Sequence, residues 1–258
     1  MLPALVVDPG SAAGLERRDP RDTLGVGKEE AAHQLAALLE ELASLQERLY
    51  AEGRRSVLLV LQGLDASGKD GTIRRVFTGV NPQGCYVTSF KAPSPVELAH
   101  DFLWRVHAQC PARGLIGIFN RSHYEDVVTV GVLGLAPGAV WRRRPERIVE
   151  FERLLADEGT TVLKCFLHVS IEEQRERFAE RLSDPSKRWK HNPKDEETSR
   201  RFGEFTTAYD EALTATSTEW APWYVIPADR NWVRNLAVAT VLVEALRRLD
   251  PQFPEAAA

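Results

Sequence analysis

The sequence predicts an α/β fold in which helices cover both faces of a mainly parallel sheet. Short apolar runs alternate with longer segments of helical periodicity, and connections of about a dozen residues or more join the runs. A chain of 258 residues is long enough for one such domain. We therefore expect three α/β/α layers around a five-stranded sheet, with strands near residues 57–61, 86–90, 115–119, 161–169 and 223–227.

Composition limits the classes of function. A hydrophobic content of 43% and a charged content of 27% are typical of soluble globular proteins, and the formal net charge of -4 excludes a generically basic nucleic-acid binder. The cysteines, Cys85, Cys110 and Cys165, show neither a disulfide framework nor metal-ligand spacing. No stretch approaches the roughly 18 apolar residues of a membrane span, and no secretory signal is recognisable. We expect a cytoplasmic protein that acts without nucleic acid or membrane.

The N-terminal part of the chain changes character at Lys28. Residues 1–27 carry glycine, proline and mixed charge without periodicity, which predicts an extended or partly ordered arm. From Lys28 onward, leucines at helical spacing predict an amphipathic helix of about 24 residues that Gly53 can terminate. The helix packs on the core or against another subunit, and core packing is the preferred interpretation. Residues 28–253 would form the single domain, followed by a tail at 254–258.

The first strand runs directly into the glycine-rich segment GLDASGKDGT at residues 63–72. Gly63, four intervening residues, Gly68 and Lys69 match the GxxxxGK spacing of a Walker A phosphate-binding loop. Backbone N–H groups can wrap a phosphate only where side chains are absent, and the lysine and the start of the next helix add positive charge. The alternative, an ordinary glycine-rich turn, is disfavoured by the buried strand just before it.

Two acids make this loop unusual. Asp70 stands where a Ser or Thr normally holds magnesium, and Asp65 lies inside the loop. A carboxylate there repels phosphate unless a cation bridges the two, so we expect Asp65 to hold Mg²⁺, with Mn²⁺ as the alternative ion. The competing interpretation is that Asp65 caps its own turn. Asp70 is either a weaker metal ligand or an ordinary first-turn acid.

The middle of the chain continues the alternation of helices and strands. The helix that leaves the loop should end near Val80, and Ser94 with Glu97 forms a capping box at the start of the next helix. The strand at 115–119 then ends in the polar segment Asn120–Asp126, where a parallel sheet presents its carboxyl edge. Polar groups there predict a site facing the glycine-rich loop.

The second half of the chain carries most of the arginines. A helix is expected at 140–157, and its arginine-rich part, 142–153, is interpreted as a solvated face. Ser170 caps another helix after the fourth strand. The stretch 175–201 is basic and interrupted by Asp-Pro and Asn-Pro, as a mobile helical lid would be. Further helices are expected at about 196–216 and 231–249.

Five separated motifs appear in the order GLDASGKDGT, FKAPSPVELAHDFLWRVH, FNRSHYEDV, RLSDPSKRWK and APWYVIPADRNW. Together they closely resemble the polyphosphate kinase 2 family over about residues 20–253. The resemblance implies a P-loop kinase-like fold and magnesium-dependent, reversible phosphoryl transfer between inorganic polyphosphate and a nucleotide. Tyr124-Glu125-Asp126 resembles the subfamily that phosphorylates both AMP and ADP. Adenine nucleotides are the expected substrates, with guanine nucleotides as the alternative, and a homo-oligomer is implied, with a tetramer favoured.

Catalytic roles follow from this resemblance. Lys69 and Arg121 would neutralise charge on the moving phosphoryl group. Glu125 is either a substrate-site carboxylate or the capping-box partner of Ser122. Asn120 stands where other branches of the family carry Asp, which puts direct metal binding there in doubt. The residues expected to surround the phosphates are Gly63, Ala66, Gly68, Asp70, Gly71 and Asn120.

The resemblance also assigns residues to the two substrates. In the lid, Lys187, Arg188 and Lys190 would meet the phosphate chain, and Asp195 matches a family acid that senses the metal or anchors the lid. Cations that would extend the polyphosphate track are Arg74, Arg75 and Arg181. Asp101 and Arg105 would flank the nucleotide, and Trp104 stacks on the base or, in the preferred interpretation, fills the core. For any single cation of the lid, a solvated basic surface is the alternative.

Two other functions fit the glycine-rich loop. One is an ATP-dependent small-molecule kinase, and the other is a nucleotide-gated binding module without catalysis. The many acids and arginines near the loop argue against the binding module.

Overall fold

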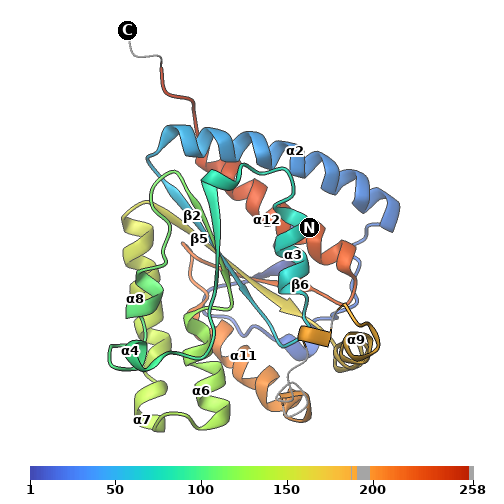
Figure 1. Ribbon diagram of the computed structural model, residues 1–258, viewed down its shortest axis with the longest axis vertical. Coiled ribbons are helices and arrows are strands. Elements are labelled where there is room, and N and C mark those ends of the chain that lie inside the picture. Colours follow the sequence, from blue (N-terminus) through green and yellow to red (C-terminus); the bar gives the residue numbers. More distant parts are fainter. Residues whose placement is uncertain (187, 191–197, 256–258) are drawn as a thin grey trace.

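A computed structural model describes residues 1–186, 188–190 and 198–255 of the chain. Its centre is a six-stranded sheet with the order β1-β6-β5-β2-β4-β3 (Figure 1). The strands are β1 (Val6–Val7), β2 (Ser56–Gln62), β3 (Cys85–Ser89), β4 (Ile116–Asn120), β5 (Thr160–His168) and β6 (Trp223–Pro227). The strands β2 to β6 run parallel to their neighbours, whereas β1 is antiparallel to β6. The predicted α/β fold is confirmed, but the five-strand count is wrong.

The additional strand comes from the N-terminal arm. Val6 pairs with Tyr224 and Val7 with Trp223, so the arm covers the edge of β6. A strand of two residues is too short to show alternation in a sequence, and glycine and proline nearby favour a loop. Residues 1–27 also contain α1 (Leu2–Leu5) and the short 3₁₀ helix η1 (Leu15–Arg17).

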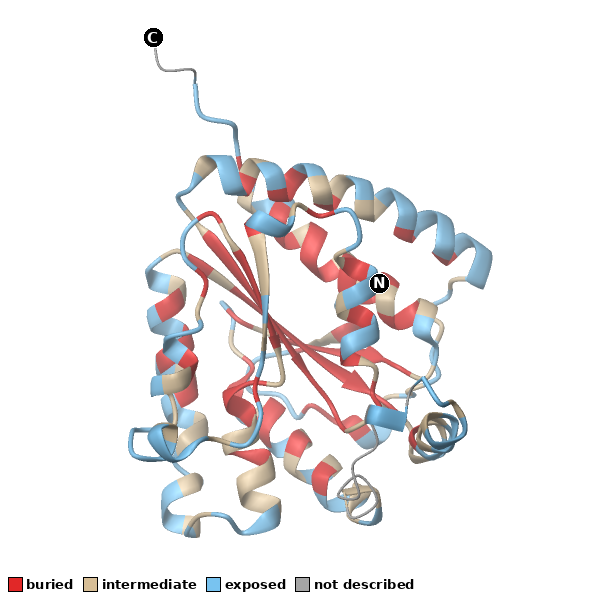
Figure 2. Ribbon diagram, in the orientation of Figure 1, coloured by how far each residue is buried: buried red, intermediate tan, exposed pale blue. Residues whose placement is uncertain are grey.

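The central strands carry the core. Every residue of β2 is buried, and so is every residue of β5 except Thr161. A strand covered by helices on both faces needs apolar residues on both sides, which explains the continuous apolar run in β2. The core therefore lies on either side of β2 and β5, as the red segments in Figure 2 show.

Helices cover both faces of the sheet (Figure 1). The first layer contains α2 (Lys28–Glu52), α3 (Lys69–Val76) and α12 (Asn231–Leu249), and the second contains α6 (Val128–Leu133), α8 (Arg144–Asp157) and α11 (Phe202–Thr216). In the first layer α2 packs along α12 through its buried leucines, so the preferred core interpretation of this helix is confirmed. Gly53, in the left-handed conformation with φ of 63°, ends α2 as expected.

The other helices are short or lie at the carboxyl edge of the sheet. They are η2 (Pro82–Gly84), α4 (Pro95–Leu98), α5 (Trp104–His107), η3 (His123–Asp126), α7 (Gly138–Trp141), α9 (Ile171–Ser183) and η4 (Arg188–Lys190). Of the predicted lid at 175–201, the structure describes residues 175–186, 188–190 and 198–201. These contain most of α9 and the whole of η4. Across the described part of the chain, every helix is too short or too polar to cross a membrane.

Two of the predicted helices are interrupted. The capping box of Ser94 and Glu97 forms, but α4 ends at Leu98 and α5 starts separately at Trp104. The helix expected at 140–157 is divided into α7 and α8, and Pro145 lies in the first turn of α8. Proline lacks the N–H that a continuous helix would need at this point, which explains the division.

The order of the strands creates a crevice. From β2 the chain passes over β4 to reach β3, whereas from β4 it passes over β2 in the opposite direction to reach β5. Connections that diverge in this way leave an opening at the carboxyl ends of the strands between them. The glycine-rich loop after β2 and the polar segment after β4 lie at this opening.

Candidate active site

A cavity of about 490 Å³ opens at the carboxyl edge of the sheet. Its walls come from the loop after β2, the segments after β3 and β4, and helices α6 and α11. Its charged and hydroxyl-bearing lining residues include Asp65, Lys91, Arg105, Arg121, Glu125, Asp126, Thr129, Arg144, Thr198, Arg201 and Tyr209. The elements expected to face one crevice therefore do so.

The backbone of the glycine-rich loop (residues 63–69) needs its glycines. Gly63 and Gly68 have φ of 147° and 102°, a region that residues with a Cβ rarely adopt. A Cβ at Gly63 would lie 2.7 Å from the carbonyl oxygen of Leu167, and one at Gly68 would lie 1.9 Å from Nη1 of Arg234. Ala66, between them, also has a positive φ of 63°. The loop is thus a tight turn packed closely against its surroundings.

Lys69 lies across this loop. Its Nζ donates hydrogen bonds to the carbonyl oxygens of Gly63 at 2.7 Å and Leu64 at 3.2 Å. Burial of the side chain, with a further contribution from Arg121, lowers the pKa of Lys69 to about 8. The ammonium group is therefore held at the loop, where its charge is poorly solvated.

The loops after β2 and β4 meet through two polar pairs. Arg121 forms a close ion pair with Asp65. The Nδ2 of Asn120 donates a hydrogen bond of 2.8 Å to Oδ1 of Asp70. The structure thus brings Asp65 and Asp70 into contact with residues at the carboxyl end of β4.

Glu125 faces the cavity and is not tied back to the start of its own helix. The Oγ of Ser122 accepts from the N–H of Tyr124, so the capping box, the alternative interpretation of Glu125, does not form. The Glu125 carboxylate instead accepts hydrogen bonds from the hydroxyls of Thr129 at 2.5 Å and Tyr209 at 3.5 Å. It also lies 4.0 Å from Nη1 of Arg121. Burial, and then the neighbouring Glu125, raise the pKa of Tyr209 well above its usual value, so its hydroxyl remains a donor.

A second group of charges lines the cavity beyond Glu125. Asp126 lies between Arg105 and Arg144, with a nitrogen of each arginine 3.5 Å from its carboxylate. Burial raises the pKa of Asp126, although both arginines act in the opposite direction. Arg105 reaches the cavity as predicted. Arg144 belongs to the helix that was interpreted as a solvated face, and for this residue that interpretation is wrong.

Other predicted residues lie away from the described cavity wall. Asp101 is exposed and accepts a hydrogen bond from the N–H of Leu103, and Arg74 and Arg75 are exposed on α3. Trp104 is 44% exposed and stacks on His100 at a centroid distance of 4.2 Å, so the preferred core interpretation is wrong. The cause is the break before α5, which turns this face of the segment outward.

The predicted lid cations are described only in part. The Arg181 guanidinium lies over the ring of Phe178, and Arg188 donates to the carbonyl oxygen of Leu182. Lys187 and Asp195 lie outside the described residues, and so does the side chain of Lys190.

Two arginines that the sequence did not single out hold the glycine-rich loop from behind. Arg177 of α9 donates to the carbonyl oxygen of Ala66 at 2.8 Å, and Arg234 of α12 packs against Gly68. Thr129, Tyr209 and Arg144 were also missed. No spacing rule marks such residues, because helices far along the chain bring them to the site.

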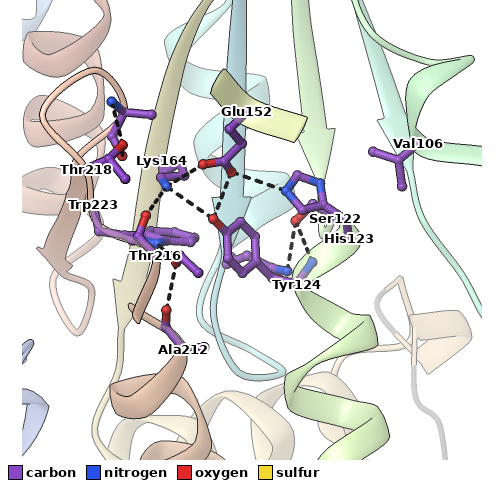
Figure 3. A network of polar contacts seen from close by, with 12 residues as sticks. Val106, Ser122, His123, Tyr124, Glu152, Lys164, Ala212, Thr216, Thr218 and Trp223 are labelled. Atoms are coloured by element: carbon purple, nitrogen blue, oxygen red, sulfur yellow. Dashed lines mark hydrogen bonds and ion pairs between the residues drawn. The ribbon is translucent and has the colours of Figure 1, made fainter. Parts of the chain in front are cut away.

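A buried polar network lies beneath the segment that carries Arg121 and Glu125 (Figure 3). Glu152 Oε1 accepts from the Tyr124 hydroxyl at 2.8 Å, and its Oε2 lies 2.6 Å from Nζ of Lys164. His123 Nε2 is 3.2 Å from Glu152 Oε1. Burial opposes ionisation of Glu152, but Lys164 and His123 outweigh it and lower the pKa of the carboxyl. The network fixes this segment to β5 and α8.

Known proteins are similar to this chain in both sequence and architecture. The family model of polyphosphate kinase 2 (PPK2) matches residues 25–254. An AMP/ADP-polyphosphate phosphotransferase of Meiothermus ruber is 55% identical over 251 residues, covering 96% of this chain and 94% of the relative. An ADP-polyphosphate phosphotransferase of Rhodopseudomonas palustris is 43% identical, covering 88% and 83%. The crystal structure of polyphosphate kinase 2 from Arthrobacter aurescens TC1 matches with a TM-score of 0.95 and 41% identity, covering 99% and 92%. The chain belongs to the polyphosphate kinase 2 family.

Proposed function

We propose that this protein is a magnesium-dependent polyphosphate:nucleotide phosphotransferase that phosphorylates both AMP and ADP. The observation that carries the proposal is the meeting of the Asp65–Arg121 pair and Glu125 at one cavity, with Lys69 hydrogen-bonded to Gly63 in its wall. Family membership and the names of the Meiothermus and Rhodopseudomonas relatives support polyphosphate as the phosphate source.

The arrangement suits phosphoryl transfer, which needs positioning and charge neutralisation more than covalent chemistry by the protein. The glycine-rich loop acts as a phosphate-binding loop, and Lys69 leaves the loop carbonyls to bind the phosphate chain. Arg121 gives up part of its ion pair with Asp65 and binds the phosphoryl group that is being transferred. The transfer is direct between the bound substrates. A phosphate oxygen of the nucleotide bonds to the terminal phosphorus of polyphosphate, and the bridging oxygen of the broken P–O bond stays on the shortened polyphosphate.

Asp65 is the residue best suited to hold magnesium, with Asp70 as the weaker ligand. Mg²⁺ usually takes one or two protein carboxylates and completes its coordination with water and substrate phosphates. No group of three or more His, Cys, Asp or Glu suited to a metal occurs within the described residues. The bound ion, Mg²⁺ or alternatively Mn²⁺, would supply positive charge between the reacting phosphates.

The apolar part of the cavity lining suits a nucleoside, and it includes Phe90, Leu98, Val130, Leu133 and Leu135. Arg105 and Arg144 line the same cavity, where they can bind the phosphate of AMP. The cavity volume of about 490 Å³ lies within the range of small-molecule sites. Adenine nucleotides are the proposed substrates, and guanine nucleotides are the alternative, because a 33% identical relative is named a putative GDP-polyphosphate phosphotransferase.

The test is to incubate the purified protein with polyphosphate and magnesium, together with AMP or ADP and no other phosphate donor. We expect ADP from AMP and ATP from ADP. Product that appears only with ATP as the donor and another small molecule as acceptor would instead support a small-molecule kinase. Tight nucleotide binding without any product would support a binding module.

We further propose a cytoplasmic homo-oligomer, with a tetramer favoured. The location is proposed from the sequence composition, and the oligomer from the resemblance described in the sequence analysis. Light scattering after gel filtration measures the oligomeric state, and a monomeric mass at micromolar concentration would contradict it.

A further inference from the structure

Two arginines, from α9 and α12, meet at the glycine-rich loop, and neither is among the residues that line the cavity. Arg177 pairs with Glu173 at 2.8 Å, and its other nitrogens donate to backbone carbonyls, including that of Ala66. Arg234 is 3% exposed, and its Nη1 donates to Asn231 Oδ1 at 2.7 Å. Its other hydrogen bonds, to Ser67 and Asn235, are longer, at 3.4 Å and 3.3 Å.

No carboxylate within the described part of the chain forms an ion pair with Arg234. Its buried Nε also has no hydrogen-bond partner among the described residues. The carboxylate that influences it is that of Glu173, which already pairs with Arg177. Two guanidinium groups thus share one carboxylate. Burial, and then Arg177, lower the pKa of Arg234 to about 9.

A buried charge without a partner destabilises a fold unless something compensates it. Here the charge lies against the glycines on either side of Lys69. A Cβ added at Gly68 would lie 1.9 Å from Nη1 of Arg234, and one at Gly71 would lie 3.3 Å from Nη2. These glycines belong to the turn and first helical residues that would present N–H groups to a phosphate. The compensating anion is therefore expected in the loop.

We propose that Arg234 is a fixed positive charge of the phosphate site, acting through the loop it supports, and that bound polyphosphate compensates this charge. The inference rests on the proposed function, because it assumes a phosphate in the glycine-rich loop. Arg234 is a positioning residue and does not touch the substrate. Its role differs from that of Lys69 and Arg121, which can move, because it is held on α12 before the substrate binds.

The proposal is tested with Arg234→Met, which removes the charge and keeps an unbranched side chain. We expect the ligand-free variant to melt at the same temperature as the wild type or higher, because an unpaired buried charge is gone. Tripolyphosphate binding with magnesium, measured by calorimetry, should weaken by about tenfold, which corresponds to roughly 1.4 kcal/mol. The KM for polyphosphate should rise while kcat changes less.

Controls separate charge from packing. Arg248→Met removes the same charge from the exposed end of α12, about 21 Å along the helix, and should leave tripolyphosphate binding unchanged. Arg234→Lys keeps the charge and should recover most of the affinity. If Arg234→Met fails to fold, Arg234→Gln provides the neutral comparison.

Two results would overturn the inference in distinguishable ways. Neutral variants with lower melting temperatures and unchanged tripolyphosphate affinity would show that Arg234 only packs the loop, while the proposed function stands. A wild-type protein that does not bind tripolyphosphate would overturn the proposed function as well.

Discussion

Arg121 adopts a backbone conformation that few residues with a side chain accept. Its φ is 64°, and Ala66 in the facing loop has a φ of 63°. Such conformations cost free energy and persist where the surrounding structure enforces them. The turn at Arg121 directs its guanidinium towards Asp65, so the strain falls where the two loops meet.

Lys69 gives a prediction of pH dependence. Because its pKa is lowered from 10.5 to about 8, the ligand-free protein loses this charge as the pH rises through about 8. We expect kcat/KM for polyphosphate to fall over that range, whereas kcat should persist to higher pH because bound phosphate favours the protonated lysine. Initial rates at saturating and limiting polyphosphate measure the two profiles. In Lys69→Arg the fall near pH 8 should disappear, since arginine stays charged; a fall that remains would assign it to another group.

Glu125 gives a prediction about substrate choice. Glu125→Gln keeps the shape but removes the charge next to Arg121, so we expect phosphorylation of AMP to fall at least about tenfold more than that of ADP. Thr129→Val, which removes the 2.5 Å hydrogen bond to Glu125, should change the same ratio by a smaller factor. Thr129→Ser is the matched control because it keeps the hydroxyl. Unchanged use of AMP in Glu125→Gln would refute the assignment to the subfamily that accepts both nucleotides.

At the scale of elements, the buried network joins β5, α8 and α11 beneath the candidate site. Lys164 on β5 contacts Glu152 on α8 and the carbonyl oxygen of Thr216 at the end of α11, at 2.6 Å and 2.7 Å (Figure 3). Tyr124 contributes its hydroxyl from the segment after β4. Because all these groups are excluded from water, each depends on its partners.

The network predicts a strong asymmetry between single and double substitutions. Lys164→Met leaves the Glu152 charge without its lysine partner and should lower the free energy of unfolding by about 3–5 kcal/mol. Adding Glu152→Gln removes that charge while keeping an acceptor for Tyr124, and should restore more than half of the loss. Urea denaturation measures both values. A double variant as unstable as the sum of the single variants would mean that the charges do not interact.

Element boundaries show where sequence reasoning works. The strand at 223–227 and the helix at 231–249 occur as predicted, because apolar periodicity and turn residues agree there. The helix expected after Ser94 is interrupted although its capping box forms. Capping decides where a helix begins, but packing against the rest of the protein decides how far it continues.

At the scale of the whole molecule, the N-terminal arm closes one edge of the sheet. Arg18 holds the arm in place, because it donates hydrogen bonds to the carbonyl oxygens of Ala4, Val6 and Ala13 at 3.0, 2.8 and 2.9 Å. Arg18 thereby secures β1 against β6. In turn, β1 covers an edge of β6 that would otherwise be free to pair with other chains.

Arg18→Ala should therefore destabilise the fold at a distance from the site. We expect the free energy of unfolding to fall by about 1–3 kcal/mol, since several carbonyl groups lose a charged donor. Thermal and urea denaturation measure the loss, and gel filtration reports any aggregation through β6. Arg17→Ala, at an exposed neighbouring position, is the matched control. Equal stability of both variants would show that the arm does not depend on Arg18.

The candidate site was predictable to different degrees. Gly63, Gly68 and Lys69 follow from spacing within one loop, and Arg121 and Glu125 from the family motif after β4. Thr129, Tyr209, Arg144, Arg177 and Arg234 were not predicted, because each reaches the site from a helix whose own pattern is ordinary. Their contacts depend on how α6, α8, α9, α11 and α12 pack around the sheet.

The sequence by itself determined the α/β class, the glycine-rich loop and membership of the polyphosphate kinase 2 family, because these depend on periodicity and on short motifs that are local in the chain. Only the tertiary structure decided that the arm supplies the sixth strand, that Glu125 faces the cavity, and that Arg234 forms no ion pair with any described residue. These features join residues far apart in the chain. Their geometry arises from packing between elements, which no local pattern specifies.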